Sequence, residues 1–225
     1  MIVQAMTPDE VYREMELDMP EVSRWWLRQR EVLIKRALKM MKFPMNVWYE
    51  YKSKRHNRWL VLAMIMGRKY NNTGMTAVVA LQKWERGYAI YYSRWPWQVA
   101  ADRMVIQPHV FDRYGERMKV DKTGIELIKH YIERSPHGES TDNSRFSGRS
   151  VRYGGRDNVC LSIRDGVLLG ENVNGIFVAH TFITYDMAGG LQKEEFEKNR
   201  SKVRSNEQLL RDIKSYMEYL KKQNQ

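Results

Sequence analysis

The sequence predicts an α+β protein in which antiparallel β-meanders pack with N-terminal, central and C-terminal helices. Short apolar runs separated by turn residues predict the strands. Stretches with apolar residues at every third or fourth position predict the helices. The chain of 225 residues is long enough for a sizeable core, and its 43% hydrophobic and 12% aromatic content is typical of a folded chain.

The chain opens with helical signals. Thr7 is suited to cap a helix, with Pro8 at the first position and Glu10 completing a capping box. Pro20 is expected to interrupt this helix, and a longer one is predicted from about Glu21 to Lys42. One side of its helical wheel is apolar and the other carries a stripe of cations. The basic stripe consists of Arg24, Arg28, Lys35, Lys39 and Lys42.

Two groups of strands follow, each with short turns rich in Gly, Asn and Asp that predict antiparallel pairing. The first group comprises Val47–Tyr51, Arg58–Met66, Thr76–Leu81, Gly87–Tyr92 and Arg103–Ile106. The second group comprises Ser150–Tyr153, Val159–Ile163, Val167–Leu169 and Ile176–Ile183.

Further helices are predicted at Pro108–Arg117, Gly124–Arg134, Gln192–Asn199 and from Ser205 onward. Residues 135–144 have the composition of a mobile loop. We expect residues 1–225 to form a single α+β unit, because no flexible linker separates the two strand groups. The alternative is two subdomains, with a basic helix and β-meander in 1–98 and a helix pair, β-meander and C-terminal helices in 99–225.

The formal net charge of +11 is unevenly distributed. Residues 1–23 sum to −5, residues 24–69 sum to +11, and the rest of the chain contributes +5. A concentrated basic surface attracts polyanions, so nucleic acid is the expected partner.

The cysteine content and the apolar runs of the sequence predict the cellular compartment of the protein. Cys160 is the single cysteine, so an internal disulfide is excluded, and its strand-like surroundings predict a small buried residue. The longest apolar run, Trp59–Met66, is far shorter than a membrane span. No signal-peptide pattern opens the sequence. We therefore expect a cytoplasmic protein with no membrane partner.

Familiar catalytic motifs are missing from the sequence. It contains no phosphate-binding GxxxxGK[ST], no GxSxG, no HExxH and no CxxC pair. The five histidines show no short metal-ligand spacing. We expect neither a metal nor a cofactor.

The most suggestive stretch is PHVFDRYGER, residues 108–117. A helical wheel places His109, Arg113 and Arg117 on one side, where two guanidinium groups could bind a phosphate and the imidazole could move a proton. The alternative is an ordinary amphipathic surface helix with pairs four residues apart. Gly115 in mid-helix weakens that alternative, because glycine costs about 1 kcal/mol there and can mark a close approach.

A resemblance extends over residues 103–184. A strand, a helix with the pattern H-x3-R-x3-R, a further helix and a meander ending in a Thr-containing strand together resemble the small ribonuclease toxins of the RelE/BrnT type. The matching helix residues are His109, Arg113 and Arg117, and the matching strands are Val159–Ile163 and Ile176–Thr184. The resemblance implies a metal-independent RNA-cleaving or RNA-binding fold, so RNA is favoured over DNA. The first hundred residues, the C-terminal helices and a long loop depart from it.

His180 is the fourth candidate catalytic residue. Strand alternation places it on one face with Ile176, Val178 and Phe182. The alternative is a hydrogen-bonded histidine in the core.

Two further features are candidates for nucleic-acid binding. Trp95 and Trp97 flank a proline after an aromatic hairpin rich in Arg and Tyr, and aromatic rings can stack on bases. The alternative is an aromatic hairpin that packs in the core. The basic stripe could contact phosphates, or it could be a solvated helix face.

The leading hypothesis is an intracellular nucleic-acid-directed protein that acts as a metal-independent ribonuclease. The alternatives are a noncatalytic nucleic-acid-binding module, and an interaction or scaffold protein that docks a partner through its terminal helices. The sequence leaves open the oligomeric state and the identity of any protein partner.

Overall fold

The computed structural model describes residues 1–68, 73–92, 103–135, 138–142, 158–189, 193–194 and 196–202. The fold class is α+β, as the sequence predicts. The predicted strand Ser150–Tyr153 and the predicted helix from Ser205 lie outside the described residues.

One sheet contains the strands of the described part of the chain. In chain order these are β1 (Met45–Lys52), β2 (Arg58–Ile65), β3 (Thr73–Trp84), β4 (Gly87–Tyr92), β5 (Arg103–Ile106), β6 (Gly138–Asp142), β7 (Asn158–Ile163), β8 (Gly166–Val173) and β9 (Ile176–Ile183). Their order across the sheet is β1-β2-β3-β4-β5-β9-β8-β7-β6. The two predicted strand groups therefore meet at the pair β5–β9 and form a single nine-stranded sheet.

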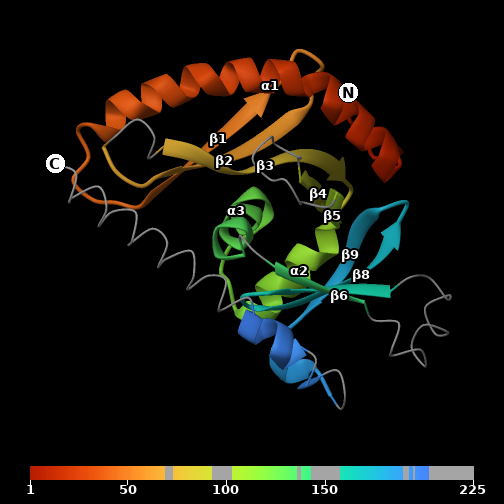
Figure 1. Cartoon of the computed structure of the whole chain (residues 1–225). Helices are drawn as coiled ribbons and strands as arrows, with labels where there is room; N and C mark the ends of the chain where they lie inside the picture. Colours follow the sequence, from red (N-terminus) through yellow and green to blue (C-terminus); the bar gives the residue numbers. More distant parts are fainter. Residues whose placement is uncertain are drawn as a thin grey trace.

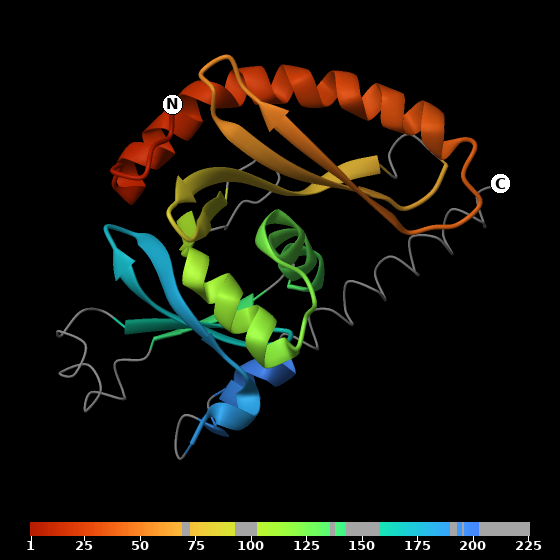
Figure 2. The same ribbon diagram turned by 180° about the vertical axis from the view of Figure 1, so that it is seen from behind.

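Helices cover both faces of this sheet. They are α1 (Pro8–Ala37), α2 (Pro108–Met118) and α3 (Gly124–Arg134), with a 3-10 turn at Tyr185–Met187 and helical residues at 193–194 and 196–202. In Figures 1 and 2, α1 runs along one side of β1–β3, and α2 and α3 lie on the other side. No described helix is both long enough and apolar enough to cross a bilayer.

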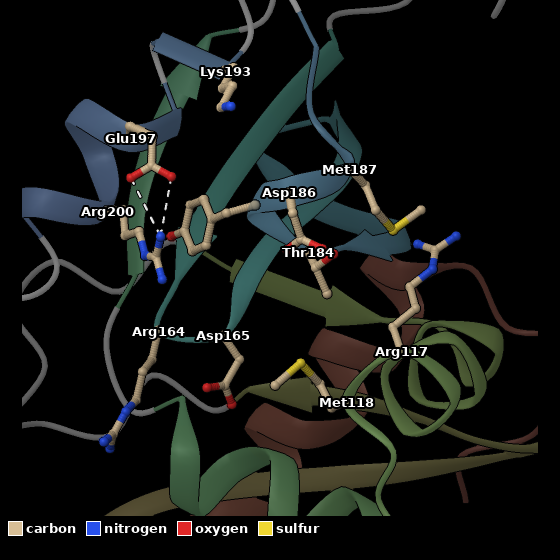
Figure 3. Close-up of a pocket in the computed structure, with 11 residues that line it drawn as sticks. Arg117, Met118, Arg164, Asp165, Thr184, Asp186, Met187, Lys193, Glu197 and Arg200 are labelled. Atoms are coloured by element: carbon tan, nitrogen blue, oxygen red, sulfur yellow. Dashed lines mark hydrogen bonds and ion pairs between the residues drawn. The ribbon is translucent and has the colours of Figure 1, made fainter.

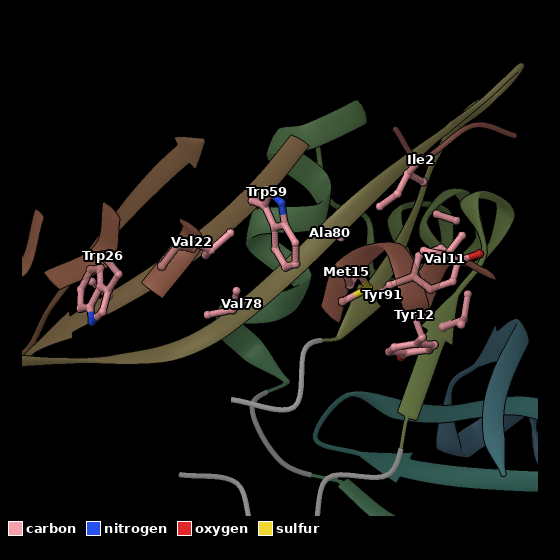
Figure 4. Close-up of a cluster of buried hydrophobic side chains, with 14 of the residues drawn as sticks. Ile2, Val11, Tyr12, Met15, Val22, Trp26, Trp59, Val78, Ala80 and Tyr91 are labelled. Carbon is pink, nitrogen blue, oxygen red and sulfur yellow. The ribbon is translucent and has the colours of Figure 1, made fainter. Parts of the chain in front are cut away.

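A core of buried side chains lies between α1 and the sheet (Figure 4). Val11, Met15, Val22 and Trp26 of α1 are buried there against Trp59 of β2. A second core lies under α2 and α3, where Tyr114 makes edge-on ring contacts with Tyr131 and Phe182, and Phe111 makes one with Tyr131. The pattern of inward-facing residues on each helix thus fixes the position of α2, the helix that carries PHVFDRYGER.

The prediction that Pro20 interrupts the first helix is wrong, because α1 is continuous through it. Buried side chains on both sides of Pro20 pack on the same sheet, and they hold the helix together although proline removes one backbone hydrogen bond. The buried carboxylate of Asp18 also accepts hydrogen bonds from Asn57 (2.7 Å) and from Trp59 of β2 (3.0 Å). The C-terminal boundary is Ala37 rather than Lys42.

Two other differences concern the sheet. Residues 138–142 form the edge strand β6 rather than a loop, because they pair with β7 from Gly138↔Ile163 to Asp142↔Val159. The pair β5–β9 is parallel, whereas the other pairs in the sheet are antiparallel as predicted. Parallel pairing requires a crossover connection, and α2, α3 and the strands β6–β8 lie between β5 and β9 in the chain.

Candidate active site

The candidate site is built where β5 ends and α2 begins. The parallel ladder between β5 and β9 runs from Arg103↔Ile176 to Ile106↔Ala179. Gln107 then leaves the sheet, and its backbone N–H donates to the Ala179 carbonyl (3.3 Å). Pro108 starts α2 directly afterwards. In open α/β sheets, ligands bind outside the carboxyl ends of the parallel strands, and this position lies at such an end of the pair β5–β9.

His180 is the next residue of β9 and sits at a β-bulge. Thr181 pairs with Leu169 and Ala179 pairs with Gly170, so His180 is an extra residue without a partner in the ladder. Bulges redirect side chains and are frequent beside active sites. The bulge corrects the predicted alternation, because Phe182 packs under α2 with Ala179 rather than sharing the face of Val178.

Both ring nitrogens of His180 have oxygen partners. Nδ1 lies 3.0 Å from Oε1 of Gln107, and Nε2 lies 3.0 Å from Oε1 of Glu171 on β8. The His180 side chain is 41% exposed and the Glu171 side chain only 10%. A largely buried carboxylate therefore orients a ring that solvent can reach. This is how acid–base histidines are commonly held.

His109 faces solvent at the first turn of α2. Partial desolvation is the main cause that lowers the pKa of His109, and the nearby His180 lowers it further, whereas Asp112 opposes the shift. Because its ordinary pKa is already below 7, a lowered value keeps His109 neutral at neutral pH. Because the His180 ring contacts Gln107, two residues before His109, the structure places these two predicted catalytic residues at the same end of α2.

The other two predicted catalytic residues lie farther along α2. Arg113 is exposed and forms an ion pair with Glu116 (3.0 Å). Arg117 is partly buried at the C-terminal end of α2, where Figure 3 shows its guanidinium beside Met187. The three residues of the H-x3-R-x3-R pattern share one side of the helix, but Arg117 is two turns away from the histidine pair.

Gly115 has a structural explanation. A Cβ at this position would lie 3.2 Å from Cδ2 of Leu127 on α3. The glycine therefore allows the two helices to approach closely, and it does not mark a ligand.

The predicted nucleic-acid-binding residues lie elsewhere. Arg24, Arg28 and Lys35 are exposed on α1, and Lys39 and Lys42 are exposed just beyond its end. None of the five forms an ion pair within the part of the chain that the structure describes. Trp95 and Trp97 lie outside the described residues.

Sequence reasoning missed two residues of the site, Gln107 and Glu171. Glu171 is a buried carboxylate in β8, and such a residue requires a partner. Neither its burial nor its partner follows from the sequence, because both depend on the pairing of β8 with the bulged β9. Gln107 gives no signal in the sequence, because its role comes from the place where the chain leaves the sheet.

Among the described residues, no three or more His, Cys, Asp or Glu side chains are grouped so that they could hold a metal ion. Cys160 is buried, as predicted. A scan of protein-family models, a search of curated proteins and a search of solved structures found no match to this chain.

Proposed function

We propose that the protein is a nucleic-acid-directed, metal-independent endoribonuclease, with His109 and His180 as its catalytic pair. The observation that carries the proposal is the position of two solvent-accessible imidazoles at the same end of α2. His180 is held by Glu171 and contacts Gln107, two residues before His109, whose pKa is lowered. The basic character of the chain supports a polyanionic substrate. RNA is favoured over DNA because the proposed chemistry needs a 2′-hydroxyl group.

The reaction uses one proton acceptor and one proton donor. Neutral His109 takes the proton of the 2′-hydroxyl as its oxygen attacks phosphorus. The bond from phosphorus to the 5′-oxygen breaks, and protonated His180 gives its proton to that leaving oxygen. The products are a 2′,3′-cyclic phosphate and a 5′-hydroxyl end, and the step needs no further reactant.

The neighbouring groups have supporting roles in this proposal. Glu171 positions His180, and the Gln107 side chain occupies the place beside Nδ1 that the substrate would take over. Arg113 lies one turn beyond His109, where its charge would stabilise the negative charge that develops on the phosphate oxygens.

The test is cleavage of a labelled RNA oligonucleotide in excess EDTA. We expect His109→Gln and His180→Gln each to lower the cleavage rate by about 100-fold or more, the usual contribution of a general acid or base. His130→Gln is the matched control, since it changes a partly exposed histidine on α3. Absence of cleavage by the unaltered protein, or full activity of the double variant, would remove the proposal.

A second candidate is noncatalytic nucleic-acid binding through the basic stripe. The observation that favours it is the exposure of all five cations. Replacement of Arg24, Arg28 and Lys35 by Glu should then weaken binding and lower the salt slope by about 0.7 to 0.9 for each lost phosphate contact. Binding that ignores both salt and these replacements would exclude this role.

A further inference from the structure

A pocket of about 700 Å³ lies at the C-terminal end of α2. The end of α2, the turn between β7 and β8, the stretch after β9 and the helical residues 193–194 and 196–200 surround it (Figure 3). Its volume is in the range of small-molecule sites. It is separate from the histidine pair, which is at the opposite end of the same helix.

The lining of this pocket is rich in cations. It contains Arg117, Arg164, Lys193 and Arg200 together with three carboxylates. Arg164 and Lys193 are exposed, and they form no ion pair with another described residue.

Two of the three carboxylates are already compensated. Asp165 accepts two hydrogen bonds from Arg134 (2.8 Å each) and one from Tyr114 (2.9 Å), which hold its pKa below the ordinary value against the effect of burial. Glu197 is paired with Arg200 (3.2 Å). The third carboxylate, Asp186, is exposed and remains uncompensated. Three cations of the lining, Arg117, Arg164 and Lys193, therefore face one uncompensated carboxylate.

Two guanidinium nitrogens at the pocket are buried without a hydrogen-bond partner in the described structure. They are Nη1 of Arg117 and Nε of Arg200, whose guanidinium also lies over the ring of Tyr185 (4.5 Å). A buried donor without a partner is unfavourable, so both arginines are suited to an anionic ligand that would reorient their side chains.

The pocket continues a row of groups that starts at the candidate active site. His109, Arg113 and Arg117 are four residues apart on α2, so successive members rise by about 6 Å along the helix. The row therefore leads from the histidine pair to the pocket over about 12 Å, a distance that a few nucleotides of a single strand would cover.

From this arrangement we infer that the pocket is a distal phosphate subsite for the same nucleic-acid strand. A strand cleaved at His109 and His180 runs along Arg113, and one of its phosphates occupies the pocket among Arg117, Arg164 and Lys193. The inference rests on the proposed function, because that function places the nucleic-acid strand at His109, the first residue of this row.

The test compares the affinities of a hexanucleotide and a dinucleotide, both labelled and made of 2′-deoxy residues so that neither can be cleaved. The variant is the double replacement Arg164→Glu with Lys193→Glu, and both positions are exposed, so folding should be preserved. Lys52→Glu is the control, an exposed cation at the end of β1, the opposite edge strand of the sheet. Thermal melting followed by circular dichroism confirms that each variant is folded.

We expect the hexanucleotide to bind the unaltered protein at least about 10-fold more tightly than the dinucleotide, with a salt slope larger by about 0.7 for each extra phosphate contact. The double variant should lose this advantage and the control should keep it. If the double variant still binds the hexanucleotide at least about 10-fold more tightly than the dinucleotide, the inference is overturned. A nucleoside monophosphate that binds as tightly as the hexanucleotide also overturns it, because the pocket would then be an independent nucleotide site.

These outcomes are distinct from failure of the proposed function. If no RNA is cleaved but the hexanucleotide advantage depends on Arg164 and Lys193, the subsite stands and the catalytic role of the histidines falls. If cleavage depends on the histidines but the advantage does not depend on these cations, the catalytic role stands and the subsite falls.

Discussion

Replacement of Glu14 by Gln should destabilise the protein in a strongly pH-dependent way. Glu14 is buried on α1 and accepts two hydrogen bonds from Arg55 (2.7 and 2.9 Å) and one from Asn57 (3.2 Å). The hydrogen bonds from Arg55 are the main cause that lowers the pKa of Glu14 from 4.5 to about 2, against the effect of burial. At ~1.4 kcal/mol per pKa unit, the full shift corresponds to ~3 kcal/mol.

Solvent reduces this value, because the Arg55 side chain is 43% exposed. We therefore expect the glutamine variant to lose about 2 kcal/mol of unfolding free energy at neutral pH. A carboxyl group whose pKa is lowered in the folded state stabilises the protein at pH values above its ordinary pKa. This stabilisation is lost as the pH falls through the pKa of the folded state. The difference between variant and parent should thus be full above pH 4.5 and should shrink toward pH 2.

The assay is urea unfolding at a series of pH values, followed by circular dichroism. Glu16→Gln is the control, because Glu16 is on the same helix but its side chain is 65% exposed. Its ion pair with Arg103 should contribute less than about 1 kcal/mol. A Glu14 variant that loses no more stability than the Glu16 variant, or a loss that does not change with pH, would refute the reasoning.

Three further predictions concern the β8–β9 region and α2. Gly170→Ala should lower the unfolding free energy by ~2 kcal/mol or more in urea titrations, because its Cβ would lie 2.1 Å from a carbonyl oxygen of β9. Tyr114→Phe should cost about 1 to 2 kcal/mol in the same assay, since the hydroxyl donates to the largely buried Asp165 carboxylate. In His180→Gln, the pKa of His109 followed by NMR should rise, because the imidazole that lowers it is removed, but it should stay below the ordinary value because desolvation remains the larger cause.

Local sequence patterns predicted the elements whose residues repeat regularly. The bounds of Gly124–Arg134 and Ile176–Ile183 are confirmed residue for residue, because an apolar repeat and flanking turn residues define each of them. The parallel pairing of β5 with β9 and the strand β6 were missed, since both depend on partners distant in sequence. Pro20 was misjudged for a related reason, because packing on both sides of it outweighs its local preference.

In the candidate site, too, local patterns predicted some features, whereas features that depend on distant residues were missed. The helical wheel was sufficient to place His109, Arg113 and Arg117 on one side of α2, because that depends only on spacing. The approach of His180 to His109 and its contact with Glu171 depend on strand register and on the bulge. Alternation along a strand holds only while each residue has a partner, and the pairing partner is absent at His180.

The bulge has a physical cause that connects the core to the proposed chemistry. Phe182 is fully buried beneath α2, and Val178 is buried on the opposite face of the sheet. In a regular strand these two residues, four positions apart, would share one face. The extra residue at His180 allows both to be buried, and it leaves the imidazole near Glu171 without a place in either core. Gly170 permits this geometry, because a side chain there would collide with the backbone of β9. If the bulge is set by packing in this way, Phe182→Ala should perturb the NMR signals of the His180 ring as well as stability, although Phe182 belongs to the core beneath α2.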